Sequence, residues 1–286
     1  MLMVSLRASF IFAFVLAAEG QNAPSWGEPF PPHRIAGNLY YVGTRGLASY
    51  LIATPDGHIL INSGLESSVP MIEQSIGKLG FRFADVKILL VSHAHWDHNA
   101  GGALLKQRTG ARYMVMEPDV AATEDGGKSD FFYGRTPAAL YQPTKVDRVL
   151  HDRDQVELGG SVLTAHLTPG HTKGCTTWTM KVRDQDRSYD VVILGSLNVN
   201  AGFKLVNNHL YPGIADDYRR AFAAVKSLPC DLFLGAHGDY YGMEAKFARL
   251  PREGTRVWAD PEGYREYVAG RERAFRAEWE RQRRSR

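Results

Sequence analysis

Several features are scarce in this chain of 286 residues. It contains only two cysteines, Cys175 and Cys230, so at most one disulfide can form within it. No Cys-x-x-C pair is present, which excludes a zinc knuckle or a dithiol redox motif. The formal net charge of +3 is small and the basic residues are scattered, so nothing indicates nucleic-acid binding. Beyond the N-terminal residues, no apolar run is long enough to suggest a membrane span.

The N-terminus differs in composition from the rest. Residues 1–7 carry one positive charge, residues 8–18 form an apolar run, and Ala18-Glu19-Gly20 offers small residues before a possible cut. This layout is that of a secretory signal peptide, because the run is too short for a comfortable membrane span. An uncleaved N-terminal anchor is the alternative. We expect a signal peptide over residues 1–20, export to the periplasm, and one domain over residues 21–286.

The mature part alternates short β-rich runs with turns and helices. Pro55-Asp56-Gly57 between two apolar runs predicts a hairpin, and the run 86–91 is typical of a strand buried on both faces. A further strand is expected at 112–116. The second half is expected to begin with the strand 148–150, followed by strands at 156–158, 162–167, 176–182, 191–194 and 231–234. Helices are expected at 69–79, 102–109, 216–228, with Asp216 as its cap, and 261–284. Two such halves without a linker predict an α/β fold with two packed sheets and outer helices.

One long segment, residues 124–145, interrupts this alternation. It is rich in Gly, Asp, Thr and Pro, and the aromatic cluster Phe131-Phe132-Tyr133 lies in its middle. A loop of this length is either functional or disordered. The aromatic residues favour a lid or a pocket wall.

The densest group of metal-binding residue types is His93-Ala94-His95-Trp96-Asp97-His98, which directly follows the strand expected at 86–91. Histidines at positions i and i+2 of an extended segment project to the same side. Imidazole nitrogen and carboxylate oxygen are good zinc donors, and the carboxyl end of a strand is a usual place for an active site. A chance cluster of three histidines and an aspartate is the weaker interpretation.

Two further histidines have the same kind of position. His171 in Pro-Gly-His-Thr and His237 in Gly-Ala-His-Gly each follow an expected strand, and small neighbours allow a close backbone approach. Either one alone could be an ordinary core or surface histidine, but together with the first motif they complete a ligand set. For the other histidines a structural role is expected; they are at positions 33, 58, 151, 166 and 209.

Over about residues 35–250 the sequence resembles the metallo-β-lactamase superfamily in its motif His-x-His-x-Asp-His and in its two later histidines. The resemblance implies an α/β fold, a four-layer αβ/βα sandwich with the metal site at the sheet edges. It also implies two zinc ions per chain and a hydroxide that bridges them. The first zinc would be bound by His93, His95 and His171, and the second by Asp97, His98 and His237.

The combination of His98 as a ligand with Ser196 in the segment Gly195-Ser196 resembles subclass B3. Most hydrolases of the superfamily, including the glyoxalase II and lactonase types, carry a bridging Asp where Ser196 stands, and the other lactamase subclasses carry a zinc-binding Cys. Some positions depart from the pattern. Asn62 replaces a common Asp that orients ligands, and Lys173 replaces a common Pro. Each cysteine lacks the partner seen in relatives, so two free thiols are expected.

The resemblance implies hydrolysis of the β-lactam ring of penicillins, cephalosporins and carbapenems, which are small-molecule substrates, by a monomer. Asp97 would ligate zinc and orient the nucleophile, so Asp97 and Ser196 are the candidate catalytic residues. Ser196 and Asn198 are the candidate substrate contacts, although Ser196 could equally only cap its strand. The alternatives are another two-zinc hydrolase such as a lactonase or thioesterase, a zinc-binding protein without catalysis, and a binding module without metal.

Overall fold

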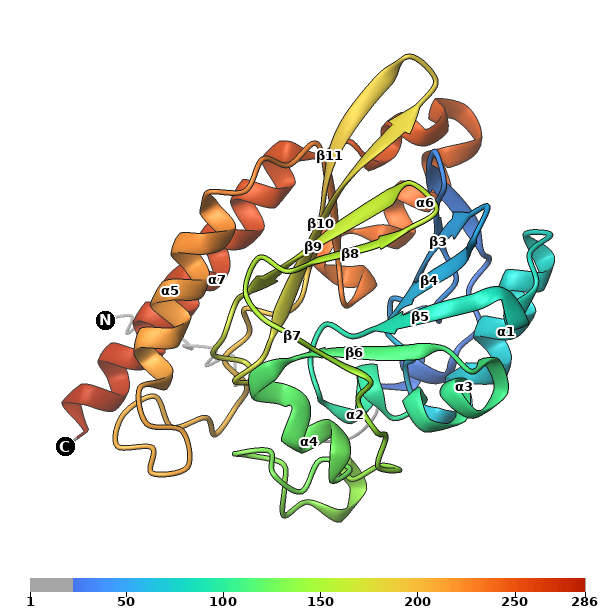
Figure 1. Cartoon of the computed structure of the whole chain (residues 1–286). Coiled ribbons are helices and arrows are strands. Elements are labelled where there is room, and N and C mark those ends of the chain that lie inside the picture. Colours follow the sequence, from blue (N-terminus) through green and yellow to red (C-terminus); the bar gives the residue numbers. More distant parts are fainter. Residues whose placement is uncertain (1–22, 286) are drawn as a thin grey trace, which may run out of the picture.

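Two β-sheets face each other in the structure, a computed structural model that describes residues 23–285 (Figure 1). The expected signal peptide lies outside these residues. The first sheet consists, in this spatial order, of β1 His33–Ala36, β2 Leu39–Tyr41, β3 Tyr50–Thr54, β4 Gly57–Ile61, β5 Val86–Leu90, β6 Arg112–Met116 and β7 Arg148–Leu150. The second consists of β12 Leu232–Gly235, β11 Arg187–Leu194, β10 Thr176–Asp184, β9 Ser161–Leu167 and β8 Gln155–Leu158.

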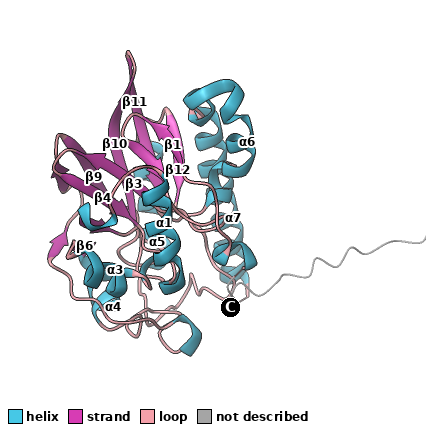
Figure 2. Cartoon of the chain, turned by 90° about the vertical axis from the view of Figure 1, so that its right-hand side faces the viewer, coloured by secondary structure: helices cyan, strands magenta, loops and turns pink. Residues whose placement is uncertain are grey.

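Helices cover the outer faces of both sheets. In Figure 1, α1 and α3 flank the first sheet and α5 and α7 run along the second. Figure 2 shows α6 and α7 together on one side of the strands. The α-helices are α1 Val69–Lys78, α2 Trp96–Asn99, α3 Gly102–Thr109, α4 Val120–Glu124, α5 Ile214–Lys226, α6 Met243–Glu253 and α7 Pro261–Arg284. The expected four-layer αβ/βα sandwich is confirmed.

Alternation along the strands separates two apolar clusters. In β4, Ile59 and Ile61 belong to the cluster that fills the space between the sheets, whereas Leu60 belongs to the cluster beneath α1 and α3. This follows from the two-residue period of a strand, which sends neighbouring side chains to opposite faces. Ile72 and Ile76 of α1 face Leu60's cluster because residues four apart share one face of a helix. Both faces of the first sheet are therefore buried, as its apolar central strands require.

The strand at 148–150 has a different partner from the one its sequence position suggests. It was expected to start the second half, but β7 pairs in parallel with β6, with Val115 opposite Val149. The chain thus completes the first sheet after the long loop 124–145 and enters the second sheet only at β8. The assignment of this strand to the second half was wrong, because an isolated three-residue strand carries no sequence signal for its partner.

The start of α5 also differs from the prediction. The helix begins at Ile214, directly after Gly213, whose φ of +83° is left-handed and suits glycine. Asp216 is therefore not the cap. Asp216 and Asp217 lie in the first helical turn, where negative charge interacts favourably with the helix dipole.

The state of the two cysteines agrees with the sequence. Cys175 is buried and Cys230 is half-buried, and both thiols are free, as expected. Within residues 23–285, no helix is long and apolar enough to cross a membrane.

His33 lies in the aromatic part of the core, where β1 meets the C-terminal segment. Its ring stacks on Tyr41 at 5.2 Å and on Trp258 at 5.1 Å between centroids, with 11° between the planes in both cases. Its Nδ1 lies 2.9 Å from the carbonyl oxygen of Pro31. Burial lowers the pKa of His33 from 6.5 to about 4, although the contact with Pro31 opposes this shift. His33 is thus a neutral core residue at neutral pH.

Replacing His33 with Phe is expected to weaken the pH dependence of stability. Between pH 6.5 and 4 the unfolded chain binds a proton at His33 that the folded chain excludes, so this stabilisation is present above pH 6.5 and is lost as the pH falls toward 4. When the pH is lowered from 7 to 5, the free energy of unfolding measured in urea should fall by about 2 kcal/mol more in the wild-type protein than in His33→Phe. Equal losses in the two proteins would contradict the assignment.

Candidate metal centre

All the candidate ligands lie just after the end of a strand, on loops that meet at one edge of the two sheets. In chain order, β5 is followed by His93, His95, Asp97 and His98, β9 by His171, and β12 by His237. Since β5 belongs to the first sheet and β9 and β12 to the second, the site is shared between the sheets. The structure thus brings all six predicted ligands to one place.

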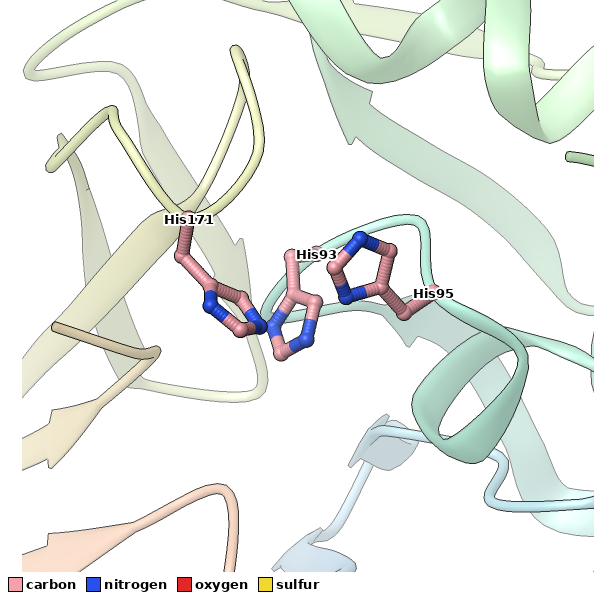
Figure 3. Close-up of side chains that lie close together, drawn as sticks. All are labelled: His93, His95 and His171. Carbon is pink, nitrogen blue, oxygen red and sulfur yellow. The ribbon is translucent and has the colours of Figure 1, made fainter. Parts of the chain in front are cut away.

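Three histidines form one compact group (Figure 3). One ring nitrogen from each of His93, His95 and His171 lies within 4.8 Å of the others. His93 Nδ1 lies 3.2 Å from Ser92 Oγ, and His171 Nδ1 lies 2.9 Å from the carbonyl oxygen of Asn198. In each of these two rings, Nε2 is therefore the nitrogen that remains available to bind a metal. His93 Nε2 is buried without a hydrogen-bond partner. Three buried imidazoles with nitrogens directed at one point form a suitable zinc site.

A second group adjoins the first. Nε2 of His98 lies 3.0 Å from Nε2 of His237, and Asp97 Oδ2 lies 3.1 Å from the former and 3.3 Å from the latter. His93, Asp97 and His98 also present ligand atoms within 4.8 Å of one another. Two imidazoles and a carboxylate at this distance are a donor set that a divalent cation can satisfy.

The electrostatics of the metal-free site favour the ligand forms of three of these groups, His93, Asp97 and His171. Burial, and then the neighbouring His98, lowers the pKa of His93 well below its usual value. Burial and His95 lower the pKa of His171 to about 3. Burial alone would raise the pKa of Asp97, but His98 and His237 lower it well below its usual range. The site therefore presents neutral His93 and His171 with an ionised Asp97, which are the forms that bind metal.

Asp119 connects the loops that carry the candidate ligands. Its carboxylate is 3% exposed; Oδ2 accepts hydrogen bonds from Ala94 N at 2.9 Å and Thr172 Oγ1 at 2.7 Å, and Oδ1 accepts from Gly174 N at 2.7 Å. Burial raises the pKa of this carboxyl, and the hydrogen bonds oppose that rise. Ala94 lies between two ligands of the first loop and Thr172 follows the ligand of the second. One side chain thus joins the two ligand loops.

Asn62, the departure noted in the sequence, fixes the start of the first ligand loop. It is fully buried with φ of +65°, a conformation that Asn tolerates better than most residues. Its Oδ1 accepts a hydrogen bond from Ser92 N at 2.8 Å, and its Nδ2 donates to Ala48 O at 3.2 Å. The side-chain oxygen of Asn62 therefore positions Ser92, the residue before His93. The side-chain N–H group anchors Asn62 to Ala48, a contact that a carboxylate could not make.

Asn198 lies at the junction of several groups. Its carbonyl oxygen accepts a hydrogen bond from Tyr218 at 2.6 Å and contacts the His171 ring. Its Nδ2 donates to Tyr240 Oη at 3.1 Å, and its Oδ1 accepts from Arg271 at 3.1 Å. The Asn198 amide is thus held in a fixed orientation at the edge of the site.

Ser196 lies deeper than Asn198. It is 1% exposed, its Oγ accepts a hydrogen bond from Asn198 N at 3.3 Å, and it lies 3.3 Å from Tyr240 Oη. Ser196 does not line the cavity described next, whereas Asn198 does. Its expected contact with a substrate stays a prediction, and its observed contacts support Asn198 and Tyr240.

A cavity of about 630 Å³ opens above the candidate ligands. His95, Asp97, His171 and His237 line its floor, and Trp26, Trp96, Tyr133 and Tyr240 supply aromatic surface. The Trp26 ring lies 5.8 Å from that of His237. Tyr133, from the long loop 124–145, forms part of the wall. A polar, metal-binding floor with aromatic walls is suited to a small molecule.

Three contributors to this site were missed in the sequence. Trp26 precedes the recognised motifs, Asp119 lies in the short segment Glu-Pro-Asp, and Tyr240 follows a ligand without matching any motif. Only Tyr240 carried a usable signal, because an aromatic three residues after His237 lies within one turn of it.

Comparisons with known proteins agree with this geometry. The model of the metallo-beta-lactamase superfamily matches residues 42–237. The native FEZ-1 metallo-beta-lactamase from Legionella gormanii has a similar structure, with a TM-score of 0.88 and 54% identity, covering 90% of this chain and 98% of that one. BJP-1, a subclass B3 metallo-beta-lactamase of Bradyrhizobium japonicum, gives a TM-score of 0.85 and 38% identity, covering 92% of this chain and 98% of that one.

Curated relatives match over shorter stretches. A hydroxyacylglutathione hydrolase from Rhodopseudomonas palustris is 28% identical over 199 residues, which are 70% of this chain and 65% of that protein. This chain spans less than two thirds of the length of the curated relatives it matches.

Replacing Asp119 with Ala is expected to lower the free energy of unfolding by about 3 kcal/mol or more, because buried donors on both ligand loops lose their acceptor. Asp119→Asn keeps one acceptor oxygen and should lose less. Urea unfolding of the metal-free proteins measures both effects. A loss below about 1 kcal/mol for the Ala variant would show that the loops hold their spacing without Asp119.

Proposed function

This chain belongs to the metallo-β-lactamase superfamily, and from that membership we propose that it is a zinc-dependent β-lactamase of the B3 kind. In this proposal it hydrolyses the β-lactam ring of penicillins, cephalosporins and carbapenems as a monomer. The observation that carries the proposal is the group of six ligand-type side chains at the cavity floor. The identity of 54% to a metallo-beta-lactamase of known structure supports it.

The donor atoms fit two zinc ions. The first would be held by three imidazoles, those of His93, His95 and His171, and the second by Asp97, His98 and His237. The buried, unpartnered His93 Nε2 and the 3.0 Å approach of two Nε2 atoms both call for a cation between the rings. Nitrogen and carboxylate donors of this number are those that zinc prefers.

Bound zinc supplies a Lewis acid for the lactam carbonyl and makes water nucleophilic near neutral pH. The chain's own residues then have positioning roles. Asp97, kept ionised by His98 and His237, would ligate the metal and orient the attacking water. Asn198 keeps one amide N–H for the carboxylate of a substrate, because its other contacts fix the side chain. Ser196 would contribute through Tyr240 and Asn198, and its direct contact with substrate is the finer part of the proposal.

A second candidate is another two-zinc hydrolase of this fold, such as a thioesterase or lactonase. The match to a hydroxyacylglutathione hydrolase favours it. Ser196 argues against this alternative, because thioesterases and lactonases of this fold share a bridging Asp at the position of Ser196. Turnover of thioesters or lactones without turnover of β-lactams would select this alternative.

We further propose that the protein acts in the periplasm after removal of residues 1–20. The layout of the N-terminal residues supports this proposal. N-terminal sequencing of the exported protein is expected to start near Gln21, and recovery of the uncut chain with the membranes would indicate an anchor.

Chelation is expected to abolish carbapenem hydrolysis, and added zinc to restore it, because the nucleophile depends on the metal. The measurement is the rate of ring opening by protein starting near Gln21, before chelation, after chelation and after zinc is returned. Folded, zinc-loaded protein without turnover of any β-lactam would overturn the proposal.

His237→Ala is expected to lower kcat/KM by roughly a hundredfold or more, because it removes a ligand of the second zinc. His209→Ala is the matched control, since His209 is exposed and lies outside both the ligand motifs and the cavity lining, and should retain wild-type activity. Equal activity of the two variants would contradict the ligand assignment.

A further inference from the structure

The long loop 124–145 is held at its middle by Asp130. The Asp130 side chain is 6% exposed, although it belongs to a surface loop. Its Oδ1 accepts hydrogen bonds from Phe132 N at 2.9 Å and Tyr133 N at 2.6 Å. Its Oδ2 lies 3.3 Å from His95 Nε2. One buried carboxylate therefore contacts both the turn of the aromatic loop and a candidate ligand.

Tyr133 is placed by the same turn. Its ring meets the ring of His95 edge-on, with centroids 5.1 Å apart and 89° between the planes, and it meets Trp96 at 5.0 Å. Asn200 Nδ2 donates a hydrogen bond to Tyr133 Oη at 3.0 Å. Tyr133 and His95 both line the cavity, so Asp130 contacts both a wall residue and a candidate ligand.

The contact with Asp130 also bears on the tautomer of His95, because the buried Nε2 has this carboxylate as its near neighbour and no hydrogen-bond partner elsewhere among the described residues. An ionised carboxylate only accepts hydrogen bonds, so it favours the form of His95 with the proton on Nε2. In this neutral form of the ring, Nδ1 carries a free lone pair. In Figure 3 one nitrogen of the His95 ring faces His93 and the other is turned away. Since Nε2 faces Asp130, the nitrogen facing the cluster is Nδ1.

We propose that Asp130 is a positioning residue that prepares His95 Nδ1 for metal and couples metal binding to the order of the aromatic loop. This inference rests on the proposed zinc site. A ligating imidazole holds its second N–H against a carboxylate more firmly once metal withdraws electrons from the ring. Metal at His95 therefore stabilises the Asp130 turn, and by reciprocity the turn stabilises bound metal.

Protease sensitivity reports the coupling in the wild-type protein. Lys128 and Arg135 flank Asp130 and are both exposed, so trypsin can cut on either side when the turn opens. We expect cleavage after these two residues to be at least about tenfold slower in zinc-loaded than in metal-free protein. Equal cleavage rates with and without zinc would overturn the proposal.

Asp130→Asn separates the two contacts. Asn keeps an oxygen that accepts from Phe132 N and Tyr133 N, so the turn and the unfolding midpoint of the metal-free protein should be preserved. Its Nδ2 would face His95 Nε2 as a donor and favour the tautomer with the proton on Nδ1. We expect zinc affinity, measured by competition with a chromophoric chelator, to fall about 10- to 100-fold. Imidazole ¹⁵N shifts of His95 should show the change of tautomer directly.

Asp125→Asn is the matched control, because Asp125 holds the same loop through Ser129, with Oδ1 accepting from Ser129 N at 3.1 Å. It should keep wild-type zinc affinity. Wild-type affinity in Asp130→Asn would overturn the inference while leaving the proposed function intact. Zinc binding with loop protection but no β-lactam turnover would overturn the proposed function alone. A wild-type protein that binds no zinc would overturn both.

Discussion

The hydrogen bonds of Asp119 are the constraint on which the geometry of the site depends. Strands of two different sheets end at the same edge, where a backbone hydrogen bond from Thr176 N to Ser92 O, 2.7 Å long, passes from one sheet to the other. The buried carboxylate of Asp119 adds a side-chain link between the two ligand loops, because it accepts from Ala94 in one loop and from Thr172 and Gly174 in the other. Its charge has a second effect. A buried anion close to a site for divalent cations offsets part of the repulsion between two ions, which water would otherwise screen.

The ligands could be predicted from the sequence because their signal is local. Histidines two residues apart after an apolar strand project together, and His171 repeats the pattern of a small residue next to a histidine at a strand end. The helix α3 and the strand β6 could also be predicted from local sequence, and their observed bounds coincide with the expected ones. Asp119 could not be predicted in this way. Its partners lie far along the chain, and Glu-Pro-Asp in isolation is an ordinary turn sequence.

The remaining differences between expectation and structure are also non-local. The three residues of β7 have the composition of a strand, but their pairing with β6 depends on where the long loop returns the chain. Ser196 matched a position in a motif, yet only the packing of Tyr240 and Asn198 shows that it lies behind the cavity wall. Sequence patterns thus identified the chemistry of the floor better than the shape of the cavity above it.

Trp26 makes part of the cavity wall depend on the N-terminal segment of the described chain. The segment around Trp26 is fastened by backbone hydrogen bonds from Gly46 N to Ser25 O and from Arg45 N to Glu28 O, both 2.9 Å long. If the proposed signal is removed near Gly20, the new N-terminus is only a few residues from this wall residue. Loss of those residues and of Trp26 would remove one aromatic ring from the cavity wall and leave all six candidate ligands in place. The width of the entrance would then depend on where the N-terminus is cut.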